Sequence, residues 1–407
     1  MIVFLKVALK NIFRSRVRSL LTILSLVIGV AALMMLNGYF KYSIWGLRES
    51  MIRGGIGHFQ VYQKGFTETT DEGGYTKLID GYKTTLRGLY DIEGVSMVAP
   101  RLRFQGILST GDTSALVVGF GGWSEEELKL NSFGVLTDGS FISDEEQQGV
   151  VIASGLAKKL GAKVGDYLTL MTTTKGGGIN AIDVHVKGII TLRIEEYNNT
   201  FMIVPLSLVQ NLIGAPNSVD RLVLILQRTE DTARVEKQLK VFCEKNGFEY
   251  KSWTELATFY SQVKEMYESI FNVVLVIVLG VVIFAIANTM TMNIYERFRE
   301  IGTIRAIGAK RKVVIQQFMV EGLLMSVIGT AVGIIVGLLL AGVINLLGGI
   351  YIPPPPGNSE GYYAFITPSL LEVFFYSLLF IIISLLATVF PAYKASRMHI
   401  IEALRTI

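Results

Sequence analysis

The sequence predicts an α-helical membrane protein with four transmembrane helices and a large mixed α/β domain inserted between the first helix and the second. Of its 407 residues, 51% are hydrophobic and only 18% are charged, whereas ordinary soluble domains carry about 25% charged residues. The apolar residues gather in four runs, each long enough, at about 20 residues, to cross a bilayer. This composition excludes a disordered, collagen-like or ordinary water-soluble protein.

Each of the four runs is predicted to be a transmembrane helix because it contains at most one charged residue. We assign the helices to residues 19–40, 270–293, 313–347 and 369–391. The first run resembles a secretory signal, but it is longer than a signal's apolar region of about 7–15 residues, and no small-residue cleavage site follows it. We therefore expect it to be retained as a helix.

The lysines and arginines beside these runs predict the orientation in the membrane. Five lie in the basic segment 1–18, six in the loop 294–312 and three in the tail 392–407, whereas the loop 348–368 has none. Cytoplasmic segments carry the excess of positive charge. Both termini are therefore predicted to be cytoplasmic, in a multi-pass protein of the inner (cytoplasmic) membrane with residues 41–269 outside. Since the cations lie beside apolar runs, topology explains them, and no nucleic-acid partner is expected.

The segment 41–269 is expected to form a mixed α/β extracytoplasmic (periplasmic) domain, because its length is sufficient to bury a core. Alternating apolar residues predict strands at 57–62, 106–110 and 183–187. From 150 to 171, an apolar start, a helical pattern and a second apolar run predict a strand, a helix and a strand.

A stalk helix is predicted at 254–269, at the end of this domain. Leu256, Phe259 and Val263 recur at helical spacing, and Thr254 is a candidate N-cap. No glycine or proline interrupts the pattern before the second transmembrane helix. A continuous helix would join the domain rigidly to the membrane and transmit motion.

The sequence shows no catalytic or metal-binding constellation. Cys243 is the only cysteine, and His58, His185 and His399 are far apart without a second ligand at metal spacing. The acidic run at 125–127 is interpreted as a solvated face, and His185 as a solvated strand residue. No Gly-x-x-x-x-Gly-Lys phosphate loop occurs. We therefore predict no catalytic residue, no metal and no cofactor bound by this chain.

The loop 294–312 is predicted to contain a short amphipathic helix at the cytoplasmic surface. Its apolar residues recur at three and four positions, at Ile294, Phe298, Ile301 and Ile304. Arg297 and Glu300 are spaced to pair, and Gly308 is a natural helix stop. Composition leaves two interpretations open, namely a helix anchored to lipid and a docking element for a cytoplasmic partner.

Three motifs in order resemble one family. The stretch Glu296-Arg-Phe-Arg-Glu-Ile-Gly-Thr-Ile-Arg-Ala-Ile-Gly-Ala309 resembles the coupling segment of MacB- and FtsX-like ABC transporter permeases. Residues 8–22 resemble the N-terminal helix of that family, and residues 391–405 resemble its C-terminal signature. The layout is most similar to that of the lipoprotein-releasing permeases LolC and LolE.

The resemblance implies a permease subunit that is not itself an enzyme. A separate ATPase, in two copies, would use ATP and Mg²⁺, and a second permease would complete a homodimer or heterodimer. A periplasmic carrier or adaptor and membrane lipids are further implied partners. The implied ATPase-coupling residues are Glu296, Arg297, Phe298, Arg299, Glu300, Ile301, Gly302, Arg305, Ala306 and Gly308.

The implied function is to extract or export a lipoprotein or another hydrophobic substrate on the outer side. The alternatives are an FtsX-like regulator that activates a periplasmic hydrolase without transport, and a sensor with no ATPase. Candidate substrate-facing residues near the outer ends of the first two spans are Leu36, Phe40, Phe271 and Val274. The competing interpretation is that these four pack the helix bundle or face lipid.

Three further features are interpreted as structural. Gly329, Gly333, Gly337 and Ala341 form a smooth ridge that favours close helix packing, within one subunit and against the first span, where Ser25 and Gly29 share the spacing. Glu321 is expected to reach water or pair with a lysine rather than to carry a transported proton. The prolines of the 348–368 loop, Pro353-Pro-Pro-Pro-Gly357, predict a stiff spacer or, alternatively, a lid.

Overall fold

The computed structural model describes residues 8, 10, 11, 16–66, 75–130, 134–192, 195–353 and 362–397. These form two compact units, which we call the helical unit (Met1–Ile44, Val263–Tyr351, Tyr363–Ile407) and the inter-span domain (Trp45–Gln262, Ile352–Tyr362). Most of the predicted N-terminal segment, Pro354 to Gly357 of the proline run and the end of the C-terminal signature lie outside the described residues.

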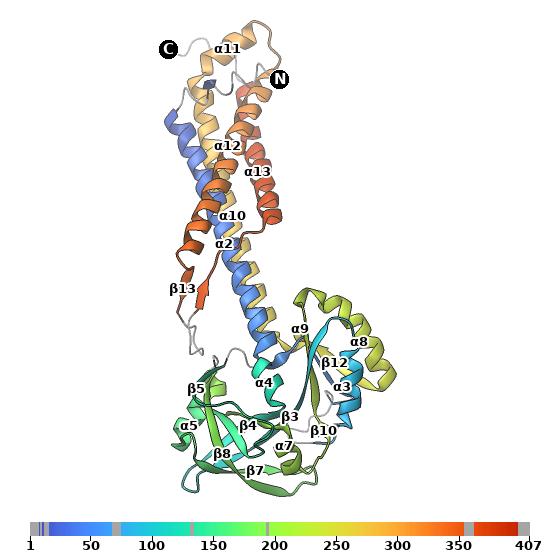
Figure 1. The fold of residues 1–407 in the computed structure, drawn as a ribbon. Coiled ribbons are helices and arrows are strands. Elements are labelled where there is room, and N and C mark those ends of the chain that lie inside the picture. Colours follow the sequence, from blue (N-terminus) through green and yellow to red (C-terminus); the bar gives the residue numbers. More distant parts are fainter. Residues whose placement is uncertain are drawn as a thin grey trace. The chain divides into compact units, whose positions relative to one another are not determined.

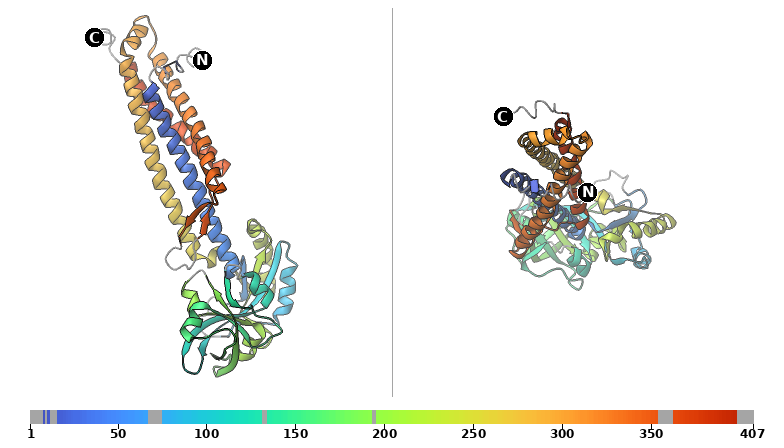
Figure 2. Two further views of the ribbon diagram at one scale, coloured as in Figure 1. Left: turned by 60° about the vertical axis from the view of Figure 1, so that its left-hand side comes forward. Right: turned by 90° about the horizontal axis from the view of Figure 1, so that it is seen from above.

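Four long helices build the helical unit. They are α2 (Arg16–Met51), α10 (Thr258–Glu296), α12 (Arg311–Leu346) and α13 (Leu370–Ser396), and each is apolar and long enough to cross a membrane. Figures 1 and 2 show α2 running beside α10. With the α/β domain described below, they confirm the predicted fold class. At about 1.5 Å per residue, α2 and α10 are nearly twice as long as the ~30 Å hydrocarbon core.

Small elements lie at both ends of this unit. The short helix α11 (Phe298–Ala306) connects α10 to α12. At the opposite end, β13 (Ile350–Ile352) pairs with β14 (Tyr362–Ala364). There Asn345 donates a hydrogen bond to the Ile366 carbonyl and accepts one from the Ile366 amide, both at 2.8 Å. Lys41 and Glu372 form an ion pair at 2.7 Å.

The glycine ridge of α12 packs against α2, as predicted. A Cβ atom added at Gly329 would lie 2.7 Å from Leu26 Cβ, and one at Gly333 would lie 2.9 Å from Val30 Cβ. The predicted contact face of the first span is wrong, however, because Gly29 faces Val278 of α10 and Phe380 of α13 instead. Small residues thus bring α2 close to its neighbours on two of its sides.

Half of the inter-span domain is a four-stranded antiparallel sheet with the order β12-β1-β11-β3. Its elements run along the chain as β1 (Phe59–Gln63), α3 (Tyr82–Tyr90), β3 (Val95–Ser109), β11 (Arg221–Leu226), α8 (Thr232–Asn246) and β12 (Phe248–Ser252). This βαββαβ order is that of a ferredoxin-like unit.

The other half, inserted between β3 and β11, is a closed ring of six strands that includes β3 itself. The ring continues through β4 (Ser114–Gly122), β9 (Phe201–Pro205), β6 (Gly149–Ala153), β8 (Ile179–Thr191) and β7 (Tyr167–Thr173), which pairs with β3 again. A further strand, β5 (Val135–Gly139), pairs with β8. The helices α4 (Ser124–Leu130), α5 (Ser154–Leu160), α6 (Glu195–Asn198) and α7 (Leu206–Ile213) connect these strands.

The predicted strands are confirmed within β1, β3 and β8, and the predicted strand–helix–strand is β6, α5 and β7. The short strands β2 (Ile79–Asp80) and β10 (Ser218–Val219) form a separate two-stranded antiparallel sheet. At the end of α2, a wide helical turn (Ile52–Ile56) precedes β1, and Gly55 within it has φ +123°, a value that favours glycine.

The predicted stalk is broken at its start. Helix α9 (Trp253–Leu256) ends at Ala257, which has φ −94° and ψ 59°, and α10 begins one residue later. Ser252, rather than Thr254, is the N-cap, and it forms a capping box with Glu255. The break buries both Trp253 and Ala257 beside Ile52. From Thr258 the helix is continuous into the second apolar run, as predicted.

Candidate functional site

The segment resembling a coupling motif folds into a corner between α10 and α12. Helix α10 ends at Glu296, and Arg297 leaves the helical conformation with φ −107° and ψ 18° before α11 begins. Gly308, with φ +104°, follows the end of α11 and allows the turn into α12. The chain therefore turns twice here, at Arg297 before α11 and at Gly308 after it.

Ion pairs and buried side chains fix one face of α11. The Arg297 guanidinium donates to Glu321 Oε1 at 2.7 Å and to Glu300 Oε2 at 3.2 Å, and its carbon lies 5.6 Å from the centre of the Phe318 ring. The predicted pairing of Arg297 with Glu300 is thus confirmed. Ile301 is buried on the same side. At the other end of α11, Arg305 Nη1 donates to the Ser396 carbonyl of α13 at 2.8 Å.

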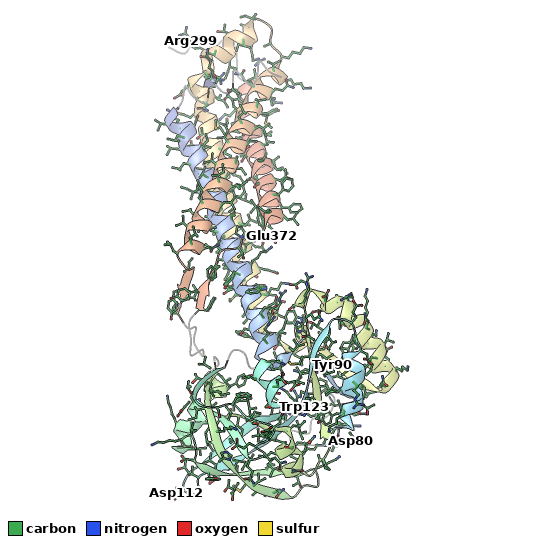
Figure 3. All side chains as sticks on the ribbon, in the orientation of Figure 1. Asp80, Tyr90, Asp112, Trp123, Arg299 and Glu372 are labelled. Atoms are coloured by element: carbon green, nitrogen blue, oxygen red, sulfur yellow. The ribbon has the colours of Figure 1, made fainter. Side chains whose placement is uncertain are left out.

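The opposite face of α11 is exposed, and its exposed residues include Arg299, Ala306 and Gly308. Figure 3 shows Arg299 at this end of the helical unit. Of the predicted apolar stripe, Ile301 is buried, whereas Ile304 is 41% exposed, and Ile307, just beyond α11, is 83% exposed. Ile307 was missed, although it lies one turn beyond Thr303 on the face opposite Ile301.

The ten predicted coupling residues therefore divide into two groups. Arg297, Ile301, Gly302 and Arg305 turn inward, and Phe298 and Glu300 are half-buried. Arg299, Ala306 and Gly308 face outward together with Glu296, which forms an ion pair with Arg18 of α2. Cations continue along the chain beyond the corner, at Lys310, Arg311 and Lys312, and all three are exposed.

Glu321 was expected to reach water or to pair with a lysine, and both expectations are wrong. The residue is only 1% exposed. Its Oε1 atom accepts hydrogen bonds from Arg297 and from the Asn11 amide, the second at 2.6 Å. An arginine and an asparagine thus donate to one oxygen of this buried carboxylate.

The four candidate substrate-facing residues lie together inside the bundle of one chain. Phe271 is buried and its ring centre lies 5.2 Å from that of Tyr376. Phe40 stacks on Tyr267 with ring centres 4.6 Å apart. Leu36 and Val274 are half-buried against the same apolar cluster. Each of the four therefore contacts protein in this structure.

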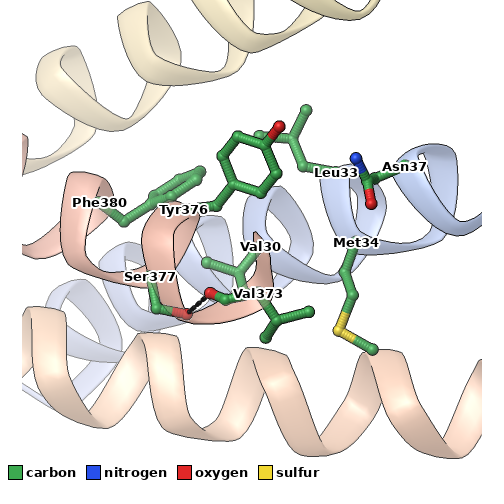
Figure 4. Close-up of a pocket in the computed structure, with 8 residues that line it drawn as sticks. All are labelled: Val30, Leu33, Met34, Asn37, Val373, Tyr376, Ser377 and Phe380. Atoms are coloured by element: carbon green, nitrogen blue, oxygen red, sulfur yellow. Dashed lines mark hydrogen bonds between the residues drawn. The ribbon is translucent and has the colours of Figure 1, made fainter. Parts of the chain in front are cut away.

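Close to these residues, a small pocket lies between α2 and α13 (Figure 4). Its walls are mostly apolar, but Asn37 from α2 and Tyr376 and Ser377 from α13 add polar atoms. Sequence reasoning missed this pocket. The available signal was Asn37, the one side-chain amide in the run 19–40.

Several titratable groups of the inter-span domain are buried or paired. Among the described residues, no group of His, Cys, Asp and Glu side chains is arranged to hold a metal. Burial raises the pKa of the Cys243 thiol to about 12, so it stays protonated at neutral pH. His185, predicted to be solvated, is half-buried in β8 with a ring nitrogen 2.7 Å from Glu146.

One carboxylate of the acidic run 125–127 is deeply buried, which corrects the interpretation of this run as a solvated face. The Glu127 side chain is 1% exposed and accepts two hydrogen bonds from Arg101 of β3, at 2.6 and 2.7 Å. The same guanidinium donates to the Gly55 carbonyl at 2.6 Å. Arg101 thus connects α4, at the start of the inserted ring, to the turn that follows α2.

Two sequence family models match this chain. Residues 19–241 match the MacB-like periplasmic core domain, and residues 272–400 match the FtsX-like permease C-terminal domain. The match to the first model covers more than half of the chain. Together with the four apolar helices and the α/β domain between the first two, these matches define a multi-pass membrane permease.

Curated relatives agree with this class. The lipoprotein-releasing system transmembrane protein LolC of Neisseria meningitidis serogroup B is 23% identical over 99% of this chain and 97% of its own. The ABC transporter permease YknZ of Bacillus subtilis is 23% identical over 98% of both chains. The macrolide export ATP-binding/permease protein MacB of Chromobacterium violaceum is 25% identical over 81% of this chain and 51% of its own. The chain belongs to the MacB-like and FtsX-like family of ABC transporter permeases.

Proposed function

We propose that this chain couples ATP hydrolysis by a separate ATPase subunit to movement of its inter-span domain, and thereby extracts or exports a lipoprotein or another hydrophobic substrate. One observation carries the coupling role. Next to the buried contacts of Arg297 and Ile301, α11 and the turn that follows it leave Ile304 and Ile307 exposed, together with Arg299. Exposed apolar residues with a charged rim are typical of a protein docking site.

The charge distribution supports the orientation that this role needs. Lys310, Arg311 and Lys312 follow the corner, and cytoplasmic segments carry such excess positive charge. The α11 end of the helical unit would then face the cytoplasm with both termini, and the inter-span domain would lie outside. Two ATPase copies would use ATP and Mg²⁺ beneath a pair of permeases, either two copies of this chain or this chain and a second one.

A long helix provides the route between the two sides. Helix α10 continues without a break from Thr258, next to the inter-span domain, to Glu296, next to the docking face. Because a helix resists bending over such a length, a displacement at the corner would reach the domain rather than dissipate in a flexible linker. A periplasmic carrier or adaptor would then act at the domain.

The hydrophobic character of the substrate is supported by the helices themselves. Phe40, Phe271 and the pocket residue Met34 contact other side chains in this structure, and they would offer apolar contacts to a substrate once the bundle opens. LolC is named for lipoprotein release and MacB for macrolide export, so the relatives differ in what they move. If the helices of the bundle separate and a substrate enters between them, we expect photo-crosslinkers at positions 36, 40, 271 and 274 to capture lipid or lipoprotein.

The docking role is tested by changing the exposed face of α11. The double variant Ile304→Asp/Ile307→Asp removes the apolar contact without altering a described hydrogen bond. When the chain is purified from membranes, we expect the double variant to carry at most one tenth of the ATPase that the parent carries. This corresponds to a loss of about 1.4 kcal/mol of binding free energy. Gln316→Asp is the control, because it adds an acidic residue at an exposed position on α12 instead of α11. Unchanged retention of the ATPase in the double variant would overturn the proposal.

A further inference from the structure

Three segments that are distant in the sequence meet at one carboxylate oxygen. Glu321 Oε1, on α12, accepts hydrogen bonds from Asn11 at 2.6 Å and from Arg297 at 2.7 Å. Arg297 is the residue at which the chain leaves α10 and enters α11. The N-terminal segment, the corner and α12 are therefore joined through a single buried group.

This junction is costly to maintain, which indicates a specific role. The side chains of Arg297 and Glu321 are 11% and 1% exposed, and such burial removes most of the hydration that stabilises each charge. Replacing a buried pair of this kind by apolar residues is often neutral or stabilising, so burial of the pair is weak evidence for a contribution to stability. A pair of fixed geometry instead specifies how two elements are oriented. An arginine suits this task because its planar fork contacts two carboxylates at once.

The remaining contacts of α11 point in the same direction. Arg305 connects the far end of the helix to α13 through the Ser396 carbonyl. Ile301 is buried between these two polar contacts. Helix α11 is thus attached to α12 at its start and to α13 near its end, whereas its covalent link to α10 passes through the non-helical Arg297.

We propose that Arg297 and Glu321 are positioning residues that make α11 move as one body with α12, so that displacement of the docking face is passed on to the bundle. This inference rests on the proposed coupling function. Without the pair, the exposed face would still bind the ATPase, but α11 would tilt independently and the displacement would be lost at the corner.

The first measurement needs no ATPase. In a Cys243→Ser background, spin labels at Thr303→Cys on α11 and Gln316→Cys on α12, both exposed positions, report the distance between the two helices in nanodiscs. We expect one narrow distance distribution for the parent and at least a twofold broadening for Arg297→Gln and for Glu321→Gln. Arg299→Gln is the matched control, because it removes an exposed arginine two positions away, and it should keep the parent width.

The second measurement uses the complex with the co-purified ATPase. Labels at Ser269→Cys on α10 and Phe374→Cys on α13 report movement at the opposite end of the bundle when ATP and Mg²⁺ are added. We expect Arg297→Gln and Glu321→Gln to retain the ATPase as the parent does, while the ATP-dependent shift falls to less than a fifth of the parent value. If the substitutions merely destabilised the corner, the retained ATPase and the ATP-dependent shift would be lost together.

Arg297→Lys keeps the inference testable if Arg297→Gln does not insert into the membrane. Lysine preserves the charge, but its single ammonium group replaces the fork that contacts Glu300 and Glu321, so an intermediate distribution width is expected. Narrow parent-like distributions in Arg297→Lys and Glu321→Gln would overturn the inference. If the parent retains no ATPase, the proposed function fails, while the first measurement still decides whether the pair positions α11.

Discussion

At the scale of single residues, His58 shows how the end of α2 is attached to the sheet of the inter-span domain. The Leu226 amide donates to its Nδ1 atom at 3.1 Å, so the neutral ring carries its proton on Nε2, 3.1 Å from the Thr229 hydroxyl. That hydroxyl donates to Glu49 of α2 at 2.9 Å. Burial of the ring lowers the pKa of His58 to about 4.

We predict that acid weakens this attachment. Between about pH 6.5, the pKa of an ordinary histidine, and pH 4, the unfolded chain binds a proton at this position that the folded chain excludes. Stability is therefore full above pH 6.5 and falls by about 3 kcal/mol as the pH drops to 4. Tryptophan fluorescence during urea unfolding of the purified chain measures this loss. His58→Gln should remove most of the slope; a slope equal to that of the parent would contradict the assignment.

A second prediction at this scale concerns Glu127. Glu127→Ala leaves the Arg101 guanidinium buried without its partner, and we expect it to reduce the unfolding free energy by about 3–5 kcal/mol. Glu125→Ala, two positions earlier in the same acidic run, removes only an exposed pair with Lys129 and should leave the unfolding midpoint unchanged. Equal effects of the two substitutions would show that burial of Glu127 does not matter.

These two glutamates also show where sequence reasoning reaches its limit. Glu125 and Glu127 are chemically identical and nearly adjacent, so composition assigns both to a solvated face. What distinguishes them is Arg101 on β3, which tertiary folding brings to Glu127 alone. The same applies to Glu321, because its partners Asn11 and Arg297 are distant in the sequence.

At the scale of elements, the transmembrane helices were predictable because lipid requires an uninterrupted apolar helix, and this requirement is visible in the sequence. The break at Ala257 was not predictable, since it follows from packing of Trp253 against Ile52 across the domain. The sequence also did not show which residues of the α11 stripe are covered, because burial of Ile301 and exposure of Ile304 depend on the neighbouring helices.

The glycine ridge of α12 gives a prediction for packing between elements. Gly329→Val places a branched side chain against Leu26, because a Cβ atom at this position would lie 2.7 Å from Leu26 Cβ, and overpacking of this kind costs about 1–3 kcal/mol. We expect a lower melting temperature in detergent. Gly342→Val is the control on the same helix, because a Cβ atom there meets no atom within 4 Å. Similar melting temperatures for the two variants would contradict close packing of α12 on α2.

At the scale of the whole molecule, the proposed coupling depends on the stiffness of α10 beyond its apolar run. Glu265→Pro removes a helical hydrogen bond and kinks the helix there, whereas Glu265→Ala preserves it. We expect the proline variant to retain the ATPase and its hydrolysis while losing at least 80% of substrate release in reconstituted vesicles. Normal release in the proline variant would show that motion does not travel along α10.

The pairing of β1 with β12 has a consequence for the order of folding. Phe59 pairs with Ser252, roughly 190 residues later, so the domain's sheet is completed only by its last strand. Closing a loop of that length costs about 4–5 kcal/mol of chain entropy in a free polypeptide. In the intact protein, Phe40 of α2 stacks on Tyr267 of α10, and this contact holds the two ends near one another. We therefore expect membrane insertion of both helices to accelerate closure of the sheet. In the proposed orientation, the domain would mature only after its final strand has crossed the membrane.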